Sequence, residues 1–175
     1  FDLSVSIILL IIFAVPMMLI SIAILSTSKG SFLYWSKRIG KNSSFFFMPK
    51  FRTMRLNSPQ VATHLLQDPD PYILPFGKFL RKCSLDELPQ LFNVLMGDMS
   101  LIGPRPLIPS QYAKYSLTTK TLLNAVRPGI SGIGSVVFRD EEALLADQEA
   151  RRFHENVIIP YKEKLENWYV ENNCF

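Results

Sequence analysis

The pattern of hydrophobic positions begins with one long apolar segment. Residues Leu3 to Leu25 include no Lys, Arg, Asp or Glu, and as a helix they would reach about 35 Å, enough to cross a hydrocarbon core of about 30 Å. Pro16 lies in the middle and removes one main-chain hydrogen bond, so we expect a bend there. The pattern predicts a membrane-anchoring helix over residues 1–28, which either spans the bilayer with a kink or turns back on itself.

Two short aromatic-rich segments follow the apolar helix. Ser31 to Ser36 and Ser44 to Met48 are separated by Gly40-Lys41-Asn42-Ser43, a run with the composition of a turn. They predict a small β-hairpin. Prolines at positions 59, 69, 71 and 75 then interrupt any long element, so we expect mostly loop there, with a short helix at most over 61–67.

Helical periodicity dominates the remainder of the chain. Phe76 to Lys82 and Leu85 to Met96 have helical patterns, and the second begins at Ser84 with a capping-box pattern and ends at Gly97. Two further amphipathic helices, separated at Pro160, are predicted over Asp140 to Val157 and Tyr161 to Val170. We therefore expect an α+β fold in which a compact, helix-rich domain with a small hairpin, residues 29–175, follows the anchor.

Two proline-containing loops each carry an arginine. Gly103 to Pro106 and Arg127 to Gly132 are not expected to continue regular structure, because proline restricts the backbone and removes a donor. Arg105 and Arg127 would therefore be held on stiff backbone. A planar guanidinium held in this way is well suited to binding phosphate.

The charge distribution favours a membrane surface over a nucleic-acid partner. The formal net charge is +4, and an ordinary solvated basic face is the simplest alternative explanation. Basic residues gather directly after the apolar segment, however, where they favour an anionic cytoplasmic leaflet. These residues are Lys29, Lys37, Arg38, Lys41, Lys50, Arg52 and Arg55.

Cysteine and histidine are scarce. Cys83 and Cys174 form no CxxC pair, and His64 and His154 are the only histidines. Metal sites built from thiolates or imidazoles are therefore not expected, and a reduced, cytoplasmic compartment is. The chain starts at Phe1 without an initiator Met, so we expect its ends to be trimmed.

The densest group of candidate catalytic residues surrounds two adjacent acids. Asp86 and Glu87 are preceded by Arg81 and Lys82 and followed by Arg105. Cations and helix-start amides would keep Asp86 ionised, so it could act as a nucleophile or a cation ligand, although acids at this position often serve only as helix caps. Two neighbouring carboxylates divide naturally into one that attacks phosphorus and one that holds Mg²⁺.

The stretch that contains these acids, SLDELPQLFNVLMGDMSLIGPRPL over 84–107, resembles the signature of the bacterial sugar transferase family, the monotopic phosphoglycosyl transferases. The resemblance covers nearly the whole chain. Further similar blocks are Arg38 to Asn42, Lys50 to Met54, Phe76 to Arg81 and Val126 to Gly132. The run Ile133 to Glu142 departs from the usual pattern and indicates a distinct branch, whose sugar substrate can differ.

The resemblance implies a double displacement. Asp86 would attack the β-phosphorus of a UDP-sugar and release UMP, and a polyprenyl phosphate such as undecaprenyl phosphate would then take the sugar phosphate from the enzyme. Glu87 would hold Mg²⁺, and Arg81 and Arg105 would contact phosphate or nucleotide. Further substrate-binding residues are expected at Lys50, Arg52 and Arg127. The product would initiate a surface glycan or a glycoprotein glycan.

The resemblance also implies a topology. Family members have a re-entrant helix that enters and leaves on the cytoplasmic side of the bacterial inner membrane at a Ser-Pro break, whereas this chain has Val15-Pro16. Charge counting alone predicts a single span with the far end inside the cell. We follow the family and expect a re-entrant helix broken at Pro16, in contact with membrane phospholipids, with a homo-oligomer or later glycosyltransferases as possible partners.

The sequence leaves two other classes of function as alternatives. An inactive membrane-bound scaffold for glycan assembly would need neither the acid pair nor the arginines. A nucleic-acid-binding domain could use Phe45 to Phe47 beside Lys50 and Arg52, but an aromatic cluster next to an apolar anchor is more simply a membrane-interface or core contact. An enzyme without a nucleic-acid partner is therefore the preferred interpretation, and the motifs leave the identity of the sugar open.

Overall fold

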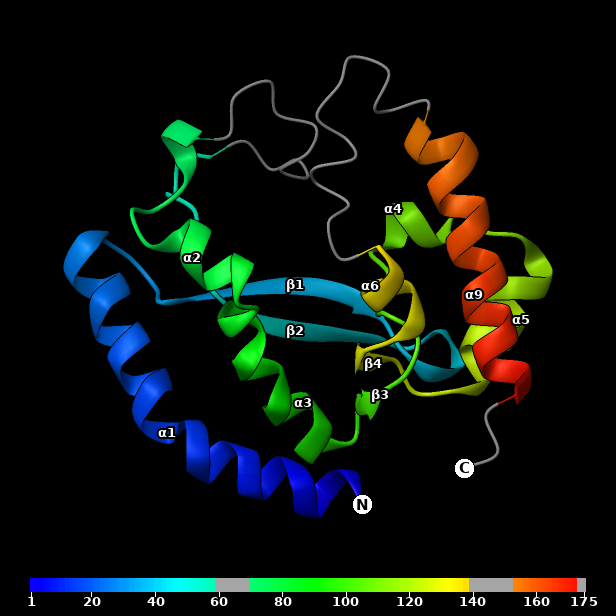
Figure 1. Ribbon diagram of the computed structural model, residues 1–175, viewed down its shortest axis with the longest axis horizontal. Coiled ribbons are helices and arrows are strands. Elements are labelled where there is room, and N and C mark those ends of the chain that lie inside the picture. Colours follow the sequence, from blue (N-terminus) through cyan, green and yellow to red (C-terminus); the bar gives the residue numbers. More distant parts are fainter. Residues whose placement is uncertain (59–69, 139–152, 173–175) are drawn as a thin grey trace. The chain divides into compact units, whose positions relative to one another are not determined.

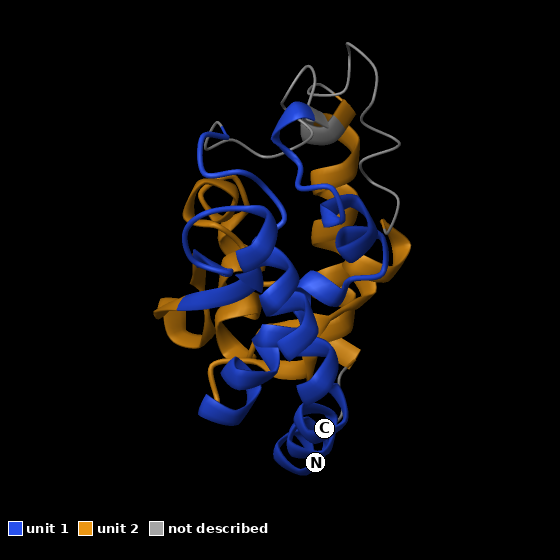
Figure 2. Ribbon diagram, turned by 90° about the vertical axis from the view of Figure 1, so that its left-hand side faces the viewer, with its two compact units in different colours: residues 1–36, 47–96 blue, residues 37–46, 97–175 orange. Residues whose placement is uncertain are grey.

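The computed structural model describes residues 1–58, 70–138 and 153–172, and it contains helices and two small sheets (Figure 1). Two compact units can be distinguished, one formed by residues 1–36 and 47–96 and the other by 37–46 and 97–175 (Figure 2). The predicted mixture of helices with a small hairpin is confirmed. The anchor helix belongs to the same unit as the Asp86-Glu87 segment.

The apolar segment forms one helix, α1, from Asp2 to Thr27, with Pro16 inside it. It is long and apolar enough to cross a membrane, and Figure 1 shows that it changes direction along its course. Its exposed apolar side chains include Leu3, Ile7, Ile8, Ile11, Ile12, Val15, Met18, Leu19, Ile22 and Leu25. So much exposed apolar surface indicates a membrane-embedded or protein-covered helix. The re-entrant topology stays a prediction.

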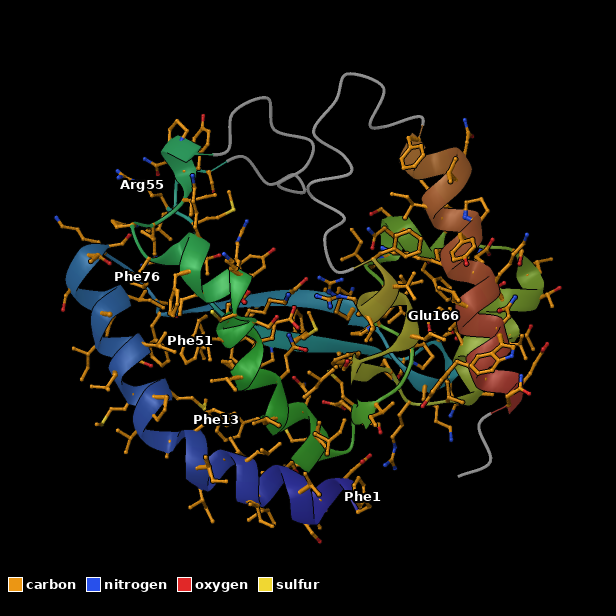
Figure 3. The ribbon with its side chains drawn as sticks, in the orientation of Figure 1. Phe1, Phe13, Phe51, Arg55, Phe76 and Glu166 are labelled. Atoms are coloured by element: carbon orange, nitrogen blue, oxygen red, sulfur yellow. The ribbon has the colours of Figure 1, made fainter. Side chains whose placement is uncertain are left out.

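The second half of α1 is packed against its own unit. Ile24 is fully buried and forms a core cluster with Phe51 and Leu74. Partly buried side chains pack against this cluster. One of them is Phe76, which Figure 3 labels together with Phe51 of the cluster itself. The other partly buried members are Met17, Ile20, Phe32, Leu33 and Leu88. The apolar helix is therefore part of the core and not a detached tail.

The predicted hairpin is confirmed, and its strands are longer than expected. Strands β1, Leu33–Ile39, and β2, Phe45–Phe51, form a two-stranded sheet. A 3₁₀ turn, η1 over Lys41–Ser43, joins them, with Asn42 at a φ of 56°. From Phe45 to Met48 exposed and buried side chains alternate, as expected for a strand with one covered face, whereas Pro49 after them is also buried.

The helix predicted over Leu85 to Met96 is wrong as a single element. After a short 3₁₀ turn, η3 (Asp70–Tyr72), and helix α2 (Gly77–Lys82), the chain forms a 3₁₀ helix, η4 (Leu85–Gln90), followed by α3 (Leu91–Met96). Pro89 accounts for the break, because it cannot donate the hydrogen bond that a continuous helix would need. Gly97, at a φ of 83°, ends α3 as predicted.

The predicted capping box is also wrong. Ser84 has a left-handed conformation, with φ at 55°, and its side chain makes no capping hydrogen bond. The backbone N–H of Glu87 instead donates to the Ser84 carbonyl at 3.2 Å. The turn that carries Glu87 therefore begins with a main-chain hydrogen bond and not with a side-chain cap.

The second unit contains a sheet that the sequence did not indicate. Strand β3, Ser100–Ile102, pairs in parallel with β4, Gly129–Ser131, with Ser100 opposite Gly129. The expectation that Arg127 to Gly132 lacks regular structure is therefore wrong for 129–131, because a three-residue strand is too short to show an alternating pattern. Short helices α4 (Pro109–Tyr112), α5 (Leu117–Ala125) and α6 (Ile133–Val137) complete this part of the chain.

The last described segment is one continuous helical run. A π-helical turn, η5 over His154–Ile158, leads directly into α9, Ile159–Asn172. The predicted boundary at Pro160 corresponds to the change from the π-helical turn to α9 between Ile158 and Ile159, although no loop separates the two elements. Pro160 lies in the first turn of α9, where its missing N–H has no partner within that helix. The helices predicted over 61–67 and over most of 140–157 lie outside the described residues.

Gly129 provides a test of this packing. A Cβ on Gly129 would overlap the backbone nitrogen of Gly103, whereas a Cβ on Gly97 would meet nothing within 4 Å and only the backbone strain would remain. We expect Gly129→Ala to lower the free energy of unfolding by about 3 kcal/mol, and Gly97→Ala by about 1 kcal/mol. Urea unfolding followed by circular dichroism checks both values, and equal losses would contradict the close β3–β4 approach.

Candidate active site

The two predicted acids lie on η4, and both are largely shielded from solvent. Asp86 is 8% exposed and the Glu87 side chain 15%. Leu88, the next residue, packs against the cluster that contains Ile24 of α1, and Pro89 is fully buried. The tight turn that carries the acids is thus fixed to the core at the position where the anchor helix joins it.

A lysine from the hairpin neutralises the second acid. The Nζ of Lys50, on β2, lies 2.6 Å from Oε1 of Glu87, and its side chain is only 18% exposed. A charge-assisted hydrogen bond of this length, shielded from water, is stronger than one at an open surface. Lys50, a predicted site residue, therefore directly contacts the turn that carries the two acids.

An arginine is oriented beside the same turn. The Nε of Arg81 donates to the Thr53 hydroxyl at 2.9 Å, and Thr53 is 6% exposed. The positive charge of Arg81 acts on the pKa of Asp86, so the two side chains are electrostatic neighbours. Thr53 was not predicted as a site residue. Its only sequence signal was its position in the Lys50 to Met54 block.

Burial controls the ionisation of Asp86. Removal from water raises the pKa of this carboxyl above its ordinary value, and the neighbouring charge of Glu87 raises it further. The positive charges of Lys50 and Arg81, together with a backbone hydrogen bond, act in the opposite direction. The expectation that nearby cations would make Asp86 easy to ionise is therefore wrong in direction, because desolvation outweighs them.

The acid pair fits one kind of magnesium site only. Within the described residues, no group of three or more His, Cys, Asp or Glu side chains could hold a metal ion. Mg²⁺ in phosphate-transfer sites, however, needs only one or two carboxylates, because substrate phosphates and water supply the other oxygens. Asp86 and Glu87 can provide that number.

Arg52, a predicted substrate-binding residue, makes hydrogen bonds to the main chain. Its guanidinium donates to the carbonyls of Ser28 at 3.1 Å and Lys29 at 2.8 Å, directly after the C-terminal end of α1, and the residue is 6% exposed. Such bonds satisfy carbonyls near a helix end that lack intrahelical partners. These bonds give Arg52 a structural role, because they fasten the end of α1 to the segment that follows β2. Its contact with substrate stays a prediction.

The other two predicted arginines belong to the second unit. Arg105 lies between the buried residues Pro104 and Pro106, and both Arg105 and Arg127 are exposed. Their backbones are stiffened by proline, as the sequence indicated. Their contact with phosphate stays a prediction.

The whole chain matches a known protein family. The family model described as bacterial sugar transferase matches residues 1–175. An undecaprenyl-phosphate galactose phosphotransferase of Salmonella typhimurium is 36% identical over 98% of this chain and 36% of its own length. An undecaprenyl-phosphate glucose phosphotransferase of Komagataeibacter xylinus is 36% identical over 87% of this chain and 30% of its own length.

A third relative carries a different sugar in its name. A UDP-N-acetylgalactosamine-undecaprenyl-phosphate N-acetylgalactosaminephosphotransferase of Aeromonas hydrophila is 38% identical over 78% of this chain and 33% of its own length. The chain thus spans about a third of the length of these three relatives. Similar identity to proteins named for galactose, glucose and N-acetylgalactosamine means that overall similarity does not select the sugar.

Proposed function

Because this chain belongs to the bacterial sugar transferase family, we propose that it transfers a sugar 1-phosphate from a UDP-sugar to undecaprenyl phosphate or a similar polyprenyl phosphate and releases UMP. The observation that carries the proposal is the buried Asp86 beside the Lys50–Glu87 ion pair, on a turn packed against the apolar helix. The relatives' names support the lipid acceptor.

The first step requires a nucleophile that water does not shield. An oxygen of the ionised Asp86 attacks the β-phosphorus of the donor, the bond from that phosphorus to the bridging oxygen breaks, and UMP leaves with the electron pair. The enzyme then carries an aspartyl phosphosugar, a mixed anhydride. Burial raises the pKa of Asp86 and also removes the hydration that would otherwise lower the reactivity of its carboxylate.

The second step returns the enzyme to its starting state. A phosphate oxygen of the polyprenyl phosphate attacks the same phosphorus, and the bond between phosphorus and Asp86 breaks. The products are a polyprenyl diphosphate sugar and the free Asp86 carboxylate. The positive charges of Lys50 and Arg81 favour this carboxylate and would also attract the phosphate groups of both substrates.

Mg²⁺ would neutralise charge on the donor diphosphate when bound. Glu87 would be its principal protein ligand. Lys50 holds one oxygen of Glu87 at 2.6 Å, which orients the carboxylate. The role of Lys50 is then to orient Glu87 and to support the ionised form of Asp86.

The placement of the turn suits a lipid substrate. Leu88 follows the acids directly and packs with Ile24 of α1, so the anchor and the acids are joined through one core cluster. A water-insoluble acceptor must be met at the membrane surface, where its phosphate lies near the headgroups. We place this reaction at the cytoplasmic face of the bacterial inner membrane, with α1 as a re-entrant helix.

The test uses the full chain in detergent or lipid nanodiscs. UDP-galactose, UDP-glucose and UDP-N-acetylgalactosamine are each incubated with undecaprenyl phosphate and Mg²⁺, and UMP is measured. Release that requires both the lipid and the metal ion is the expected result and identifies the sugar. No release from folded protein across a broad panel would overturn the proposal and favour a scaffold.

A further inference from the structure

A buried carboxyl in the second unit has no part in the chemistry above. Glu166 lies on α9 and is 6% exposed. Figure 3 labels it between α9 and α6, and a Cβ on Gly134 of α6 would lie 2.6 Å from its Oε1 atom. Burial raises the pKa of this carboxyl to about 7, opposed by a hydrogen bond from the Arg105 backbone and by the charge of Lys162. Keeping an acid in such surroundings calls for an explanation.

The main-chain contact of Glu166 is unusual in its position. Its carboxyl accepts a hydrogen bond from the backbone N–H of Arg105. Pro104 and Pro106 flank that residue and have no N–H of their own. The Arg105 N–H is therefore the only main-chain donor of this tripeptide, and a side chain more than sixty positions away in the sequence satisfies it.

The remainder of the same tract is also fixed through its main chain. In every residue from 103 to 107 a main-chain N–H or carbonyl group makes a hydrogen bond. The partner is a side chain at Arg105 and Pro106 and main chain at the other three residues. The other four bonds are Gly103 N–H to Ser131 O at 2.9 Å, Gly129 N–H to Pro104 O at 2.8 Å, Arg38 Nη1 to Pro106 O at 3.0 Å, and Ile39 N–H to Leu107 O at 3.0 Å.

The side chains of the tract point in different directions. Pro104 and Pro106 are buried, while Arg105 between them is exposed. We propose that Glu166 is a positioning residue for Arg105, because it fixes the backbone from which the guanidinium reaches an anionic phosphate group. The inference rests on the proposed function, since that function gives Arg105 a phosphate to bind.

The surroundings of Glu166 allow a nearly isosteric test. Its Oε2 atom has no hydrogen-bond partner among the described residues, and neither has the hydroxyl of Ser135. Both residues line a cavity of about 40 Å³ together with Arg105 and Lys162, which is room for one water molecule. A glutamine can therefore replace Glu166 without crowding, and its amide oxygen can still accept from the Arg105 N–H.

The experiment compares Glu166→Gln and Glu166→Leu, each alone and combined with Arg105→Ala, by UMP release from the full chain. We expect Glu166→Gln to stay within about 3-fold of the unaltered chain and Glu166→Leu to lower kcat/KM about 10-fold. If Glu166 acts through Arg105, then Glu166→Leu has no further effect once Arg105 is alanine. Equal, additive losses in the two backgrounds would overturn the inference.

A matched control lies one turn earlier on the same helix. The carboxylate of Glu163 accepts from the backbone N–H of Ser116 at 2.8 Å, so it also joins α9 to a loop, but to a different one. We expect Glu163→Leu to leave kcat/KM unchanged within about 2-fold. A loss equal to that of Glu166→Leu would mean that any break in the α9 contacts matters, and it would overturn the specific role of Glu166.

Hydrogen exchange separates this inference from the proposed function. The Arg105 amide should be protected in the unaltered chain and in Glu166→Gln, and should exchange at least 10-fold faster in Glu166→Leu. Indistinguishable exchange in all three proteins overturns the inference even if UMP is released. Failure of the unaltered chain to release UMP overturns the function alone. If Glu166→Leu lacks a cooperative melting transition, Glu166→Asp, shorter by one methylene, replaces it with the same expectations.

Discussion

Asp86→Asn should lower the rate of UMP release by about 10⁴-fold, a loss typical of removing the side chain that reacts with the substrate. The amide has the shape of the carboxylate but cannot form the acyl phosphate. The loss should fall on kcat and not on KM, because donor binding does not depend on the attacking oxygen. The measurement is UMP release with saturating UDP-sugar, undecaprenyl phosphate and Mg²⁺.

The same variant should not lose stability at pH 7. Burial raises the pKa of Asp86 in the folded protein, so ionisation of this group opposes folding. The penalty is absent below the unfolded pKa, grows as the pH rises, and is fully present above the folded pKa. Asn carries no such charge, and Asp86→Asn should therefore melt at or above the temperature of the unaltered chain at pH 7.

A matched control removes an exposed carboxylate by the same chemical change. Glu171 lies near the end of α9 and is exposed. Glu171→Gln should retain full activity. If Asp86→Asn keeps more than about a tenth of the activity while the control is normal, then Asp86 is not the group that attacks phosphorus.

Elements with strong local signals could be predicted from the sequence. The apolar run specifies α1 because an uncharged stretch of that length has few other stable environments. The hairpin followed from two short aromatic runs with a turn between them.

Local patterns failed where one backbone angle decided the outcome. Ser84 and Glu87 have the spacing of a capping box, but the left-handed conformation of Ser84 directs the chain into a 3₁₀ turn.

The candidate site was predicted in part, because its members come from distant parts of the chain. The acid pair was visible as a motif, and Lys50 was named as a substrate ligand. The 2.6 Å contact between Lys50 and Glu87 depends on the folded hairpin and cannot be read from spacing. Burial was also invisible, and it reverses the expected direction of the Asp86 pKa. A list of nearby charges predicts ionisation only when the exposure of the group is known.

Lys50→Met should reduce UMP release by about 10²-fold at pH 7, more than any other cation near the acidic turn. The substitution removes the partner of Glu87 and one of the two positive charges that lower the pKa of Asp86. That pKa must then rise further above its ordinary value, so a smaller fraction of Asp86 is ionised at a given pH. The acidic limb of the activity profile should move to higher pH.

The pH profile distinguishes this effect from simple loss of substrate binding. A lost phosphate contact would lower kcat/KM by the same factor at pH 6 and pH 8. If Lys50 acts by stabilising the ionised carboxylate of Asp86, its removal should cause a larger loss of kcat/KM at pH 6 than at pH 8. A higher pKa of Asp86 lowers the ionised fraction most at low pH.

Lys50→Arg keeps the positive charge and should leave the acidic limb of the profile near its original position. Lys29→Met, which removes an exposed lysine of the same unit, should change neither the rate nor the limb. Parallel profiles for Lys50→Met and the unaltered chain would show that Lys50 does not act through the ionisation of Asp86, and its contact with Glu87 would then serve to orient that carboxylate alone.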